Sequence, residues 1–433
     1  MARVPRRSER HAAGRFDTPR PRRYRSLLRC RSSRRLPQKV SPLPSRTPYR
    51  AFATFYFTQF AILGIYLPYF PLYLRSLHLT GPQIGVLMAL APVSRFLFPA
   101  FWGLWADRLG HRKPLIVISL AGSAVVFSLF FWVREFSALA TAMFLYGFLL
   151  VPALPLVEAL VQEEVEEKRV AYGRVRLWGS VGFIGLTLVF GLLLDRGPLR
   201  SVLIGILALS LFGLFAGLAL PAGAPPGMHP RRSLRKELRR LDLSLFLTAT
   251  ALMQASHCAY YVFYSIHLDR LGFSRSAIGG FWTLAVGAEV LMMLGAGSLL
   301  AKFGTPRLLS LCLALAALRW GILAGSSAVW LLAGGQLLHA FTFGLFHVCA
   351  VGHTHRMFPP ALRSSGQSLY SSLTYGLGSL IGFFGSAGLV DRIGIRSLFG
   401  LSAAVALLAL LLSLRLWTRG FGNGIPSPSG RGG

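Results

Sequence analysis

The sequence predicts an all-α membrane protein with twelve transmembrane helices, arranged as two pseudo-symmetric six-helix bundles. Three observations support this prediction: the composition, the spacing of the apolar segments and an internal repeat. Of the 433 residues, 53% are hydrophobic and only 14% are charged, and the mean hydropathy is +0.54. A water-soluble protein of this length needs more charge to cover its surface, so the composition argues against a soluble class.

Twelve apolar segments are long enough to cross the hydrocarbon layer, which takes about 20 helical residues. We expect spans at 51–74, 83–105, 114–133, 136–158, 174–194 and 199–220, and then at 242–267, 276–301, 307–325, 328–351, 364–389 and 394–416. The predicted organisation is a basic disordered tail at 1–50, bundles at 51–220 and 242–418, a basic cytoplasmic linker at 221–241 and a disordered tail at 419–433.

Basic residues give the chain a net charge of +31, and they gather in the N-terminal tail and in short loops. The tail holds sixteen Lys and Arg among its first 50 residues, and it either contacts anionic lipid head groups or is dispensable. The loops expected on one side of the membrane hold most of the other basic residues, which predicts that both termini are cytoplasmic. This distribution argues against a nucleic-acid partner and indicates a multi-pass protein of the cytoplasmic (inner) membrane.

An internal repeat relates the two halves, because residues 74–115 align without gaps on residues 268–309. Gly85 falls on Gly279, and Gly103 falls on Gly297. Parallel repeats of this kind place the solute path between two similar bundles near the midplane, and the halves rock around that path.

The segment from Gly103 to Lys113 resembles the cytoplasmic loop signature of the major facilitator superfamily, between its second and third helices. Residues 172–183, 338–344 and 366–378 resemble its phenylpropionate-permease-like branch, which is related to the nucleoside and lactose proton symporters. The resemblance covers residues 51–416 and implies the major facilitator fold and transport by alternating access. We expect Gly103 to permit a close helix contact. The implied cytoplasmic gate consists of Gly103, Asp107, Arg108, Gly110 and Arg112.

Ionisable residues at membrane depth cost about 3 kcal/mol or more each, so each needs a structural or functional reason. The repeat places Arg95 and Glu289 at equivalent positions in the second and eighth spans. Glu289, Arg319 and His339 resemble the layout of lactose-type proton symporters, which implies that Glu289 exchanges a proton and that the other two residues tune it. The chain departs from that layout at Thr342, where those symporters carry a further carboxylate. The alternative is that Glu289 and Arg319 form a structural ion pair.

Further polar and aromatic side chains share helix faces with these charges. The predicted substrate-binding residues are Gln59, Arg95, Gln254, His257, Tyr261, Gln336 and Tyr370. For each of them the alternative role is helix packing. The arginines favour an anionic solute, whereas the tyrosines and glutamines equally suit sugars or nucleosides.

The chain has no phosphate-binding loop for ATP and no protease or hydrolase motif, and no soluble segment is long enough to hold an active site. We therefore predict no enzyme, no cofactor and no metal site. The predicted function is secondary active, proton-coupled transport of a small solute (an organic or aromatic acid, a nucleoside or a sugar) by a monomer in contact with membrane lipids. The alternatives are a non-transporting membrane scaffold or assembly factor, and a lipid flippase of the same fold.

Overall fold

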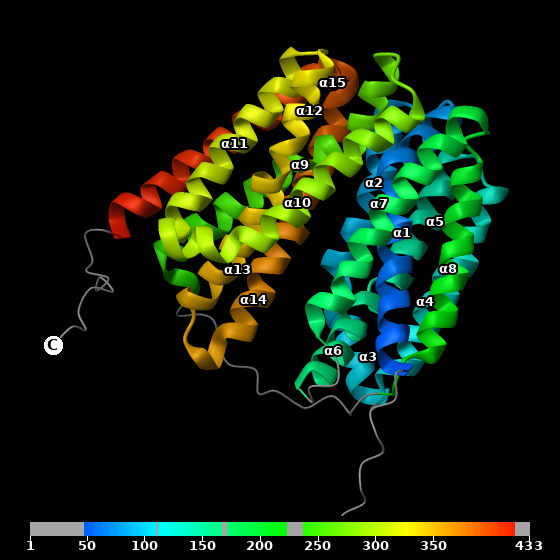
Figure 1. The fold of residues 1–433 in the computed structure, drawn as a ribbon, viewed down its shortest axis with the longest axis horizontal. Coiled ribbons are helices and arrows are strands. Elements are labelled where there is room, and N and C mark those ends of the chain that lie inside the picture. Colours follow the sequence, from blue (N-terminus) through cyan, green and yellow to red (C-terminus); the bar gives the residue numbers. More distant parts are fainter. Residues whose placement is uncertain (1–46, 110, 167–170, 223–236, 421–433) are drawn as a thin grey trace, which may run out of the picture. The chain divides into compact units, whose positions relative to one another are not determined.

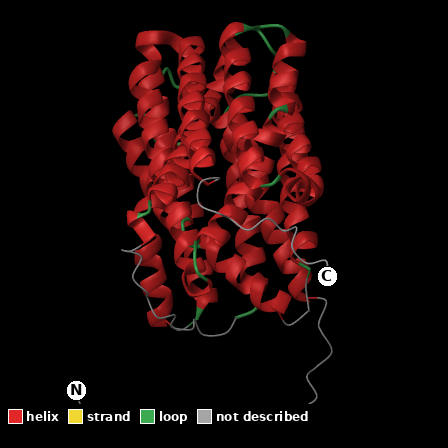
Figure 2. Cartoon of the chain, turned by 90° about the vertical axis from the view of Figure 1, so that its left-hand side faces the viewer, coloured by secondary structure: helices red, strands yellow, loops and turns green. Residues whose placement is uncertain are grey.

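The computed structural model describes residues 47–109, 111–166, 171–222 and 237–420. Nearly all of the predicted N-terminal tail, most of the linker, the end of the C-terminal tail and Gly110 lie outside the described residues. Every regular element in the described residues is helical (Figure 2).

The first half of the chain forms helices that follow the first six predicted spans. Their bounds are α1 (Thr47–Ser76), α2 (Gly81–Leu97), α3 (Pro99–Leu109), α4 (Arg112–Ser128), the 3₁₀ turn η1 (Leu129–Phe131), α5 (Phe136–Leu150), α6 (Ala153–Glu166), α7 (Tyr172–Arg196) and α8 (Ser201–Ala219).

The second half follows the last six predicted spans. Its elements are η2 (Glu237–Arg239), α9 (Leu241–Arg270), α10 (Arg275–Phe303), α11 (Thr305–Gly325), α12 (Val329–Leu337), the π-helical η3 (Ala340–Leu345), α13 (Phe346–Met357), η4 (Pro360–Leu362), α14 (Arg363–Ser371), the π-helical η5 (Ser372–Gly378) and α15 (Ser379–Gly420).

Two spans of the first half are broken at prolines. Helix α2 ends at Leu97 and α3 begins at Pro99, while α5 ends at Leu150 and α6 begins at Ala153, directly after Pro152. Proline lacks the N–H that an uninterrupted helix requires, but it fits the first turn of a new one. Residues around both breaks line a cavity that also contains Arg95.

Nine helical runs in the described residues are long and apolar enough to cross a membrane. One of these nine runs comprises residues 363–415. The backbone turns within it at Gly394, where φ is 77°, and this turn separates the last two predicted spans. Helix α9 and the broken α2–α3 pair fall outside that count. The fold is therefore an all-α membrane protein as predicted, and the number twelve stays a prediction.

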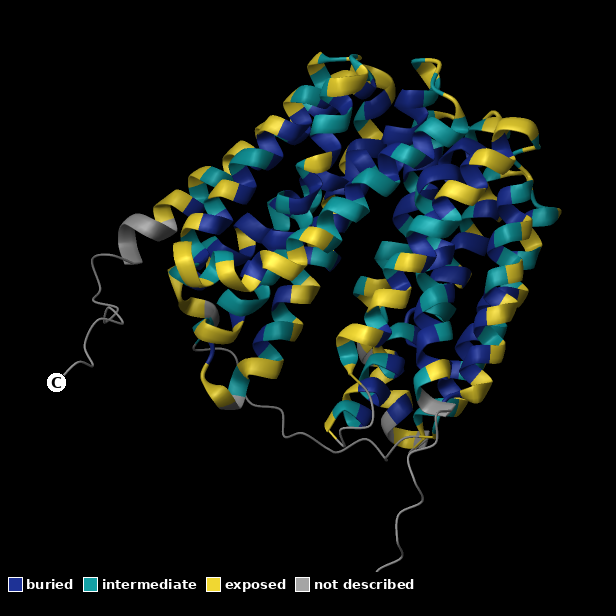
Figure 3. Cartoon of the chain, in the orientation of Figure 1, coloured by how far each residue is buried: buried dark blue, intermediate teal, exposed yellow. Residues whose placement is uncertain are grey.

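Within the unit Ser45–Gly433, helices α1–α8 pack mainly on one another, and so do α9–α15 (Figure 1). Each bundle has buried residues inside and exposed residues on its outer faces (Figure 3). Many of those exposed residues are large and apolar, such as Phe215, Leu294 and Leu411, which suits a surface in contact with lipid. The halves meet where α7 packs on α10, α2 on α15 and α1 on α9.

Polar contacts between the halves gather at what we call the sealed end, which comprises the C-terminal ends of α1, α7 and α9 and the N-terminal ends of α2 and α10. There Arg75 Nη1 donates to Asp269 Oδ2 across the two halves at 3.0 Å. Asp195 Oδ1 accepts the backbone N–H groups of Arg275 at 2.6 Å and Ser276 at 3.2 Å. Because free N–H groups and a partial positive charge mark a helix N-terminus, Asp195 of the first half caps α10 of the second.

Two glycines matched by the repeat also lie at this interface. A methyl group added at Gly85 would lie 2.6 Å from Cβ of Ala387, and one added at Gly279 would lie 2.9 Å from the carbonyl oxygen of Thr187. Such distances exclude any side chain, so the repeat puts a glycine at equivalent close contacts on both sides of the interface.

The expected close contact at Gly103 is absent. A methyl group added there would meet nothing within 4 Å, and the neighbouring Phe101 and Leu104 are exposed. The reason is that the halves lie apart toward this end, where α6 and α14 are separated in Figure 1. The polar contacts between the halves are thus at one end, and α6 and α14 lie apart at the other, which we call the open end.

We expect Asp195→Asn to shift the conformational equilibrium toward separation of the sealed end. Asparagine keeps an acceptor oxygen but removes the negative charge, which near a helix N-terminus is worth about 0.3–1 kcal/mol, a roughly 2- to 5-fold change in the equilibrium constant. Spin labels at Ser76 and Arg270, both exposed at the sealed end, would report the change as a second, longer distance. Glu135→Gln is the matched control, because Glu135 precedes α5 without capping it. Identical distance distributions for both variants would show that the cap does not hold the end shut.

Candidate functional site

Polar side chains of the second half contact one another at membrane depth, and we call this group the C-half polar cluster. Its members come from α9, α10, α11, α12 and the segment around η3, and they are Tyr260, Glu289, Arg319, Gln336, His339 and Thr342. All of them are buried except Glu289, whose side chain is 13% exposed.

Arg319 is the centre of this cluster, and its side chain is fully buried. Its Nη1 lies 2.8 Å from Nδ1 of His339 and donates to Oγ1 of Thr342 at 3.2 Å, while its Nη2 donates to Oε1 of Gln336 at 3.2 Å. The guanidinium carbon also lies 4.4 Å from the ring centroid of Tyr260. Three acceptors and an aromatic face therefore compensate a charge that would otherwise be very costly to bury.

Arg319 determines how His339 faces Glu289. An arginine can only donate, so Nδ1 of His339 must be the acceptor, and a neutral imidazole then carries its proton on Nε2. That Nε2 atom lies 3.6 Å from Oε2 of Glu289. The distance is too long for a hydrogen bond but suits electrostatic contact. The predicted alternative of a direct Glu289–Arg319 ion pair is not present, because His339 lies between the two.

The π-helical turn η3 shapes the same site. It begins directly after His339 and includes Thr342 and Gly344. A methyl group added at Gly344 would lie 3.0 Å from Cγ of Glu289, so the glycine lets α10 bring this carboxylate close to η3. π-Helical turns are rare and often mark functional sites, and a pattern based on the α-helical period does not reveal them.

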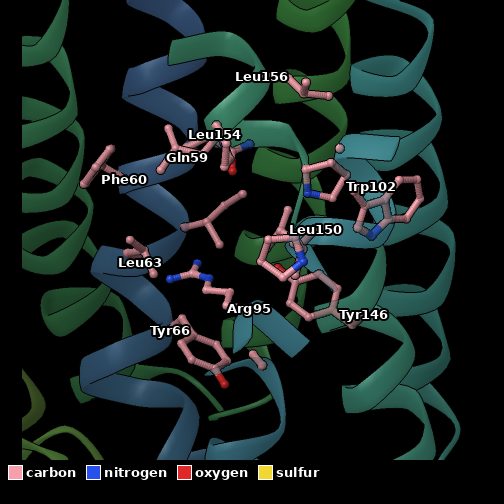
Figure 4. A pocket seen from close by; sticks show the side chains of 17 residues that line it. Gln59, Phe60, Leu63, Tyr66, Arg95, Trp102, Tyr146, Leu150, Leu154 and Leu156 are labelled. Atoms are coloured by element: carbon pink, nitrogen blue, oxygen red, sulfur yellow. The ribbon is translucent and has the colours of Figure 1, made fainter. Parts of the chain in front are cut away.

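The first half contains a cavity of about 360 Å³ between α1, the α2–α3 break and the α5–α6 break. Gln59 and Arg95, both predicted as substrate-binding residues, line it. In Figure 4 the Arg95 side chain projects among the labelled lining residues, with Tyr66 and Tyr146 on either side of it. The other predicted substrate-binding residues belong to the second half and do not line this cavity.

A second polar group in the first half includes Arg176, which is not among the predicted site residues. Its guanidinium carbon lies 4.0 Å from the ring centroid of Phe60, and Glu158 on α6 is its electrostatic neighbour. Arg176 also interacts electrostatically with Glu289 and His347 of the other half. Its partners come from several helices, so spacing within α7 could not identify them.

The remaining predicted substrate-binding residues bond to or pack against other groups of the second half. Nδ1 of His257 bonds the Met253 carbonyl oxygen at 2.9 Å, and Nε2 of Gln254 donates to Oγ of Ser379 at 3.0 Å. Tyr261 contacts Tyr260, and Tyr370 is fully buried with its ring stacked on that of Phe246. A role of these residues in substrate binding stays a prediction.

The predicted gate residues lie on α3 and at the start of α4. Arg112 forms an ion pair with Glu163 on α6, Arg108 is exposed, and Gly103 also lines the cavity. Gly110 lies outside the described residues, and of Asp107 only the backbone is described. The gate role of the set stays a prediction.

Comparison with known proteins shows similarity along most of the chain. The model of the MFS_1 like family matches residues 49–401. The chain is 30% identical to the "Probable 3-phenylpropionic acid transporter" of Escherichia coli (strain K12), with 82% of this chain and 95% of that protein aligned. It is also 30% identical to the maltose permease of Geobacillus stearothermophilus, with 83% and 93% aligned.

Solved structures with the same fold include the nucleoside transporter NupG, which is 19% identical to this chain and superimposes with a TM-score of 0.73. The alignment covers 85% of this chain and 98% of NupG. Another is a bacterial homologue of the human lysosomal transporter Spinster, solved in an inward-facing and unoccupied conformation. It is 13% identical with a TM-score of 0.70, and the alignment covers 90% of this chain and 100% of that one. At these identities the likeness shows the fold alone.

Proposed function

Because the chain belongs to the MFS_1 like family of the major facilitator superfamily, a family of transporters, we propose that it moves a small solute together with protons by alternating access. The relatives named above are described as transporters of phenylpropionic acid, maltose and nucleosides. These names support a small organic solute (an acid, a sugar or a nucleoside) and a transporter that is not an enzyme.

The proposal of proton coupling rests on one observation. Glu289 contacts His339, and His339 in turn contacts the buried Arg319. A carboxylate at membrane depth is stable when it is protonated or when a cation compensates it. Glu289 has the Nε2 atom of His339 at 3.6 Å, in electrostatic contact, and also has the charge of Arg176 as an electrostatic neighbour. These surroundings allow both protonation states of Glu289.

The proposed cycle uses those two states. Protonated Glu289 is neutral, so the halves can close over it and the solute without enclosing an uncompensated charge. When the halves separate on the other side, the proton leaves Glu289 and the carboxylate is compensated by the cations around it. Solute and proton cross the membrane together because closure around the solute needs protonated Glu289, and the empty transporter returns with the carboxylate compensated by those cations.

The charge distribution of the loops supports a cytoplasmic-membrane protein with both termini in the cytoplasm. The bundles are residues 51–220 and 242–418, and the sealed end then faces away from the cytoplasm, so this structure is the inward-facing state. We propose that the working unit is a monomer, with protons and membrane lipids as its other partners, and that it binds no nucleic acid.

Uptake into proteoliposomes tests this function. A panel of labelled acids, nucleosides and sugars is offered with and without an inward proton gradient. We expect gradient-driven accumulation by the wild type, its loss in Glu289→Gln, and normal solute exchange across the membrane in that variant, because the amide cannot carry a transferable proton. Glu166→Gln, at an exposed carboxylate at the end of α6, should behave as wild type.

Accumulation by Glu289→Gln at the wild-type level would show that Glu289 is structural. If no solute of the panel crosses at all, the alternative of a non-transporting scaffold or of a lipid flippase gains support.

A further inference from the structure

We infer that the cavity in the first half binds the transported solute, and that this solute is a monocarboxylate with a flat apolar body. The inference rests on the proposed transport function and adds to it the chemical class of the solute.

The cationic group of the cavity has no partner. Among the described residues no carboxylate pairs with Arg95 and no acceptor bonds its guanidinium; its electrostatic neighbours are the phenols of Tyr66 and Tyr146. By contrast, Arg319 has three acceptors and Arg176 has Glu158 as a neighbour. A cation held at membrane depth without a counter-ion favours an anion that enters from solution.

Arg95 is also accessible to a ligand. Its side chain is exposed although the residue lies inside the bundle, because the exposed surface faces the cavity. In Figure 4 its guanidinium extends toward Leu63, above the ring of Tyr66. Residues on both sides of the two helix breaks line this space together with Arg95.

The rest of the lining is apolar or aromatic and offers few hydrogen bonds. Leucine, isoleucine, proline and aromatic side chains make up most of it, and the indole N–H of Trp102 already donates to the carbonyl oxygen of Phe148 at 3.0 Å. Besides Arg95, the remaining polar side chains are Gln59 and the hydroxyls of Tyr66 and Tyr146. A sugar would leave several hydroxyl groups without partners here, which costs about 1–3 kcal/mol for each.

The size of the cavity sets the size of the solute. A volume of about 360 Å³ is at the lower end for small-molecule sites. At about 30 Å³ for each water-sized group, it holds roughly a dozen non-hydrogen atoms. One cation at one side of an apolar space suits one carboxylate at the end of a hydrocarbon or single-ring body. A second carboxylate would lack a cation to compensate it.

Calorimetric titration of the purified full-length protein in detergent tests this inference. The probes are 3-phenylpropionate and related aromatic and aliphatic monocarboxylates, the neutral 3-phenylpropanamide, maltose and uridine. We expect the wild type to bind the carboxylate at least about tenfold more tightly than the amide of the same shape. Arg95→Gln should weaken carboxylate binding by about 10- to 100-fold without weakening amide binding, and Arg95→Lys should recover part of the loss.

Arg50→Gln is the matched control, because it removes one arginine from the exposed start of α1 in the same half and should bind as wild type. Arg95→Gln is folded if it elutes as a single species and if it loses affinity for the carboxylate but not for the amide. The inference is overturned if the acid and the amide bind equally to the wild type, if Arg95→Gln binds the acid as tightly as wild type, or if only maltose, uridine or no probe binds.

Binding without a gradient is independent of coupling, so the two proposals can fail separately. If the carboxylate binds through Arg95 but Glu289→Gln still accumulates it, proton coupling through Glu289 is wrong and the solute class stands. If a neutral sugar or nucleoside accumulates in a way that needs Glu289 but not Arg95, the transport proposal stands and the solute class is wrong.

Discussion

Gly279→Trp is expected to keep the sealed end from closing and to lower the transport rate by roughly 100-fold or more. Gly279 lies where α10 meets α7, and even a methyl group there would come within 2.9 Å of the Thr187 carbonyl oxygen. Overpacking by a few methylene groups costs about 1–3 kcal/mol, and an indole ring adds far more volume than that. Relief requires displacement of the Tyr69 hydroxyl, which that methyl group would also contact, and separation of α7 from α10, which would disfavour the state observed here.

Gly280→Trp provides the control for this variant. Gly280 is the next residue on the same helix, and a methyl group added there would meet nothing within 4 Å. Spin labels at Ser76 and Arg270, in a background with Cys30 replaced by serine, would report a single long distance in Gly279→Trp. In Gly280→Trp they would report the wild-type distance. Equal transport by the two tryptophan variants would show that this contact does not control the cycle.

Arg319→Met is expected to give the largest loss of stability of any single substitution in the C-half polar cluster. The change leaves Gln336, His339 and Thr342 without their shared donor. Removing one partner from a buried charged network costs about 3–5 kcal/mol. Unfolding of the purified protein by heat or by titration with a denaturing detergent measures the effect.

Two further variants make this result specific. Arg319→Lys should recover little, because one ammonium cannot reach the acceptors that the planar guanidinium bridges. Arg392→Met, at an exposed arginine of α15, should change stability by less than about 0.5 kcal/mol. A loss below about 1 kcal/mol in Arg319→Met would contradict the role of Arg319 as the centre of the cluster.

The path of the helices could be predicted well from the sequence, because long apolar segments separated by charged loops have few other solutions in a membrane. The repeat also identified Gly85 and Gly279 as equivalent, and both lie at close contacts between the halves. The family prediction is confirmed by the match over residues 49–401. These features depend on composition and periodicity, which a sequence displays directly.

The site could be predicted only in part. The residue types of the C-half polar cluster were evident, but the place of His339 between Glu289 and Arg319 depends on the π-helical turn and on Gly344. Tyr260 was missed because its role is to donate to Gln336 on another helix, at 2.9 Å. Contacts between distant helices leave no mark in the spacing of one helix.

Arg95 and Glu289 show how one repeated position has taken two roles. In the first half residues around the helix breaks line a cavity with Arg95, which forms no ion pair within the part of the chain that the structure describes. In the second half α10 is continuous past Glu289, which packs against Gly344 and faces His339. Opposite charges at equivalent positions thus divide solute binding from proton exchange in the proposed mechanism.

The most direct test of the central claim, that Glu289 couples protons to the solute, is to measure proton movement itself. Solute is added to weakly buffered proteoliposomes without a preformed gradient, and the external pH is recorded. We predict that the medium around wild-type vesicles becomes more alkaline as solute enters, and that Glu289→Gln takes up solute to equilibrium with no change in pH. An unchanged pH around wild-type vesicles during uptake, or the same alkalinisation with Glu289→Gln, would contradict the account.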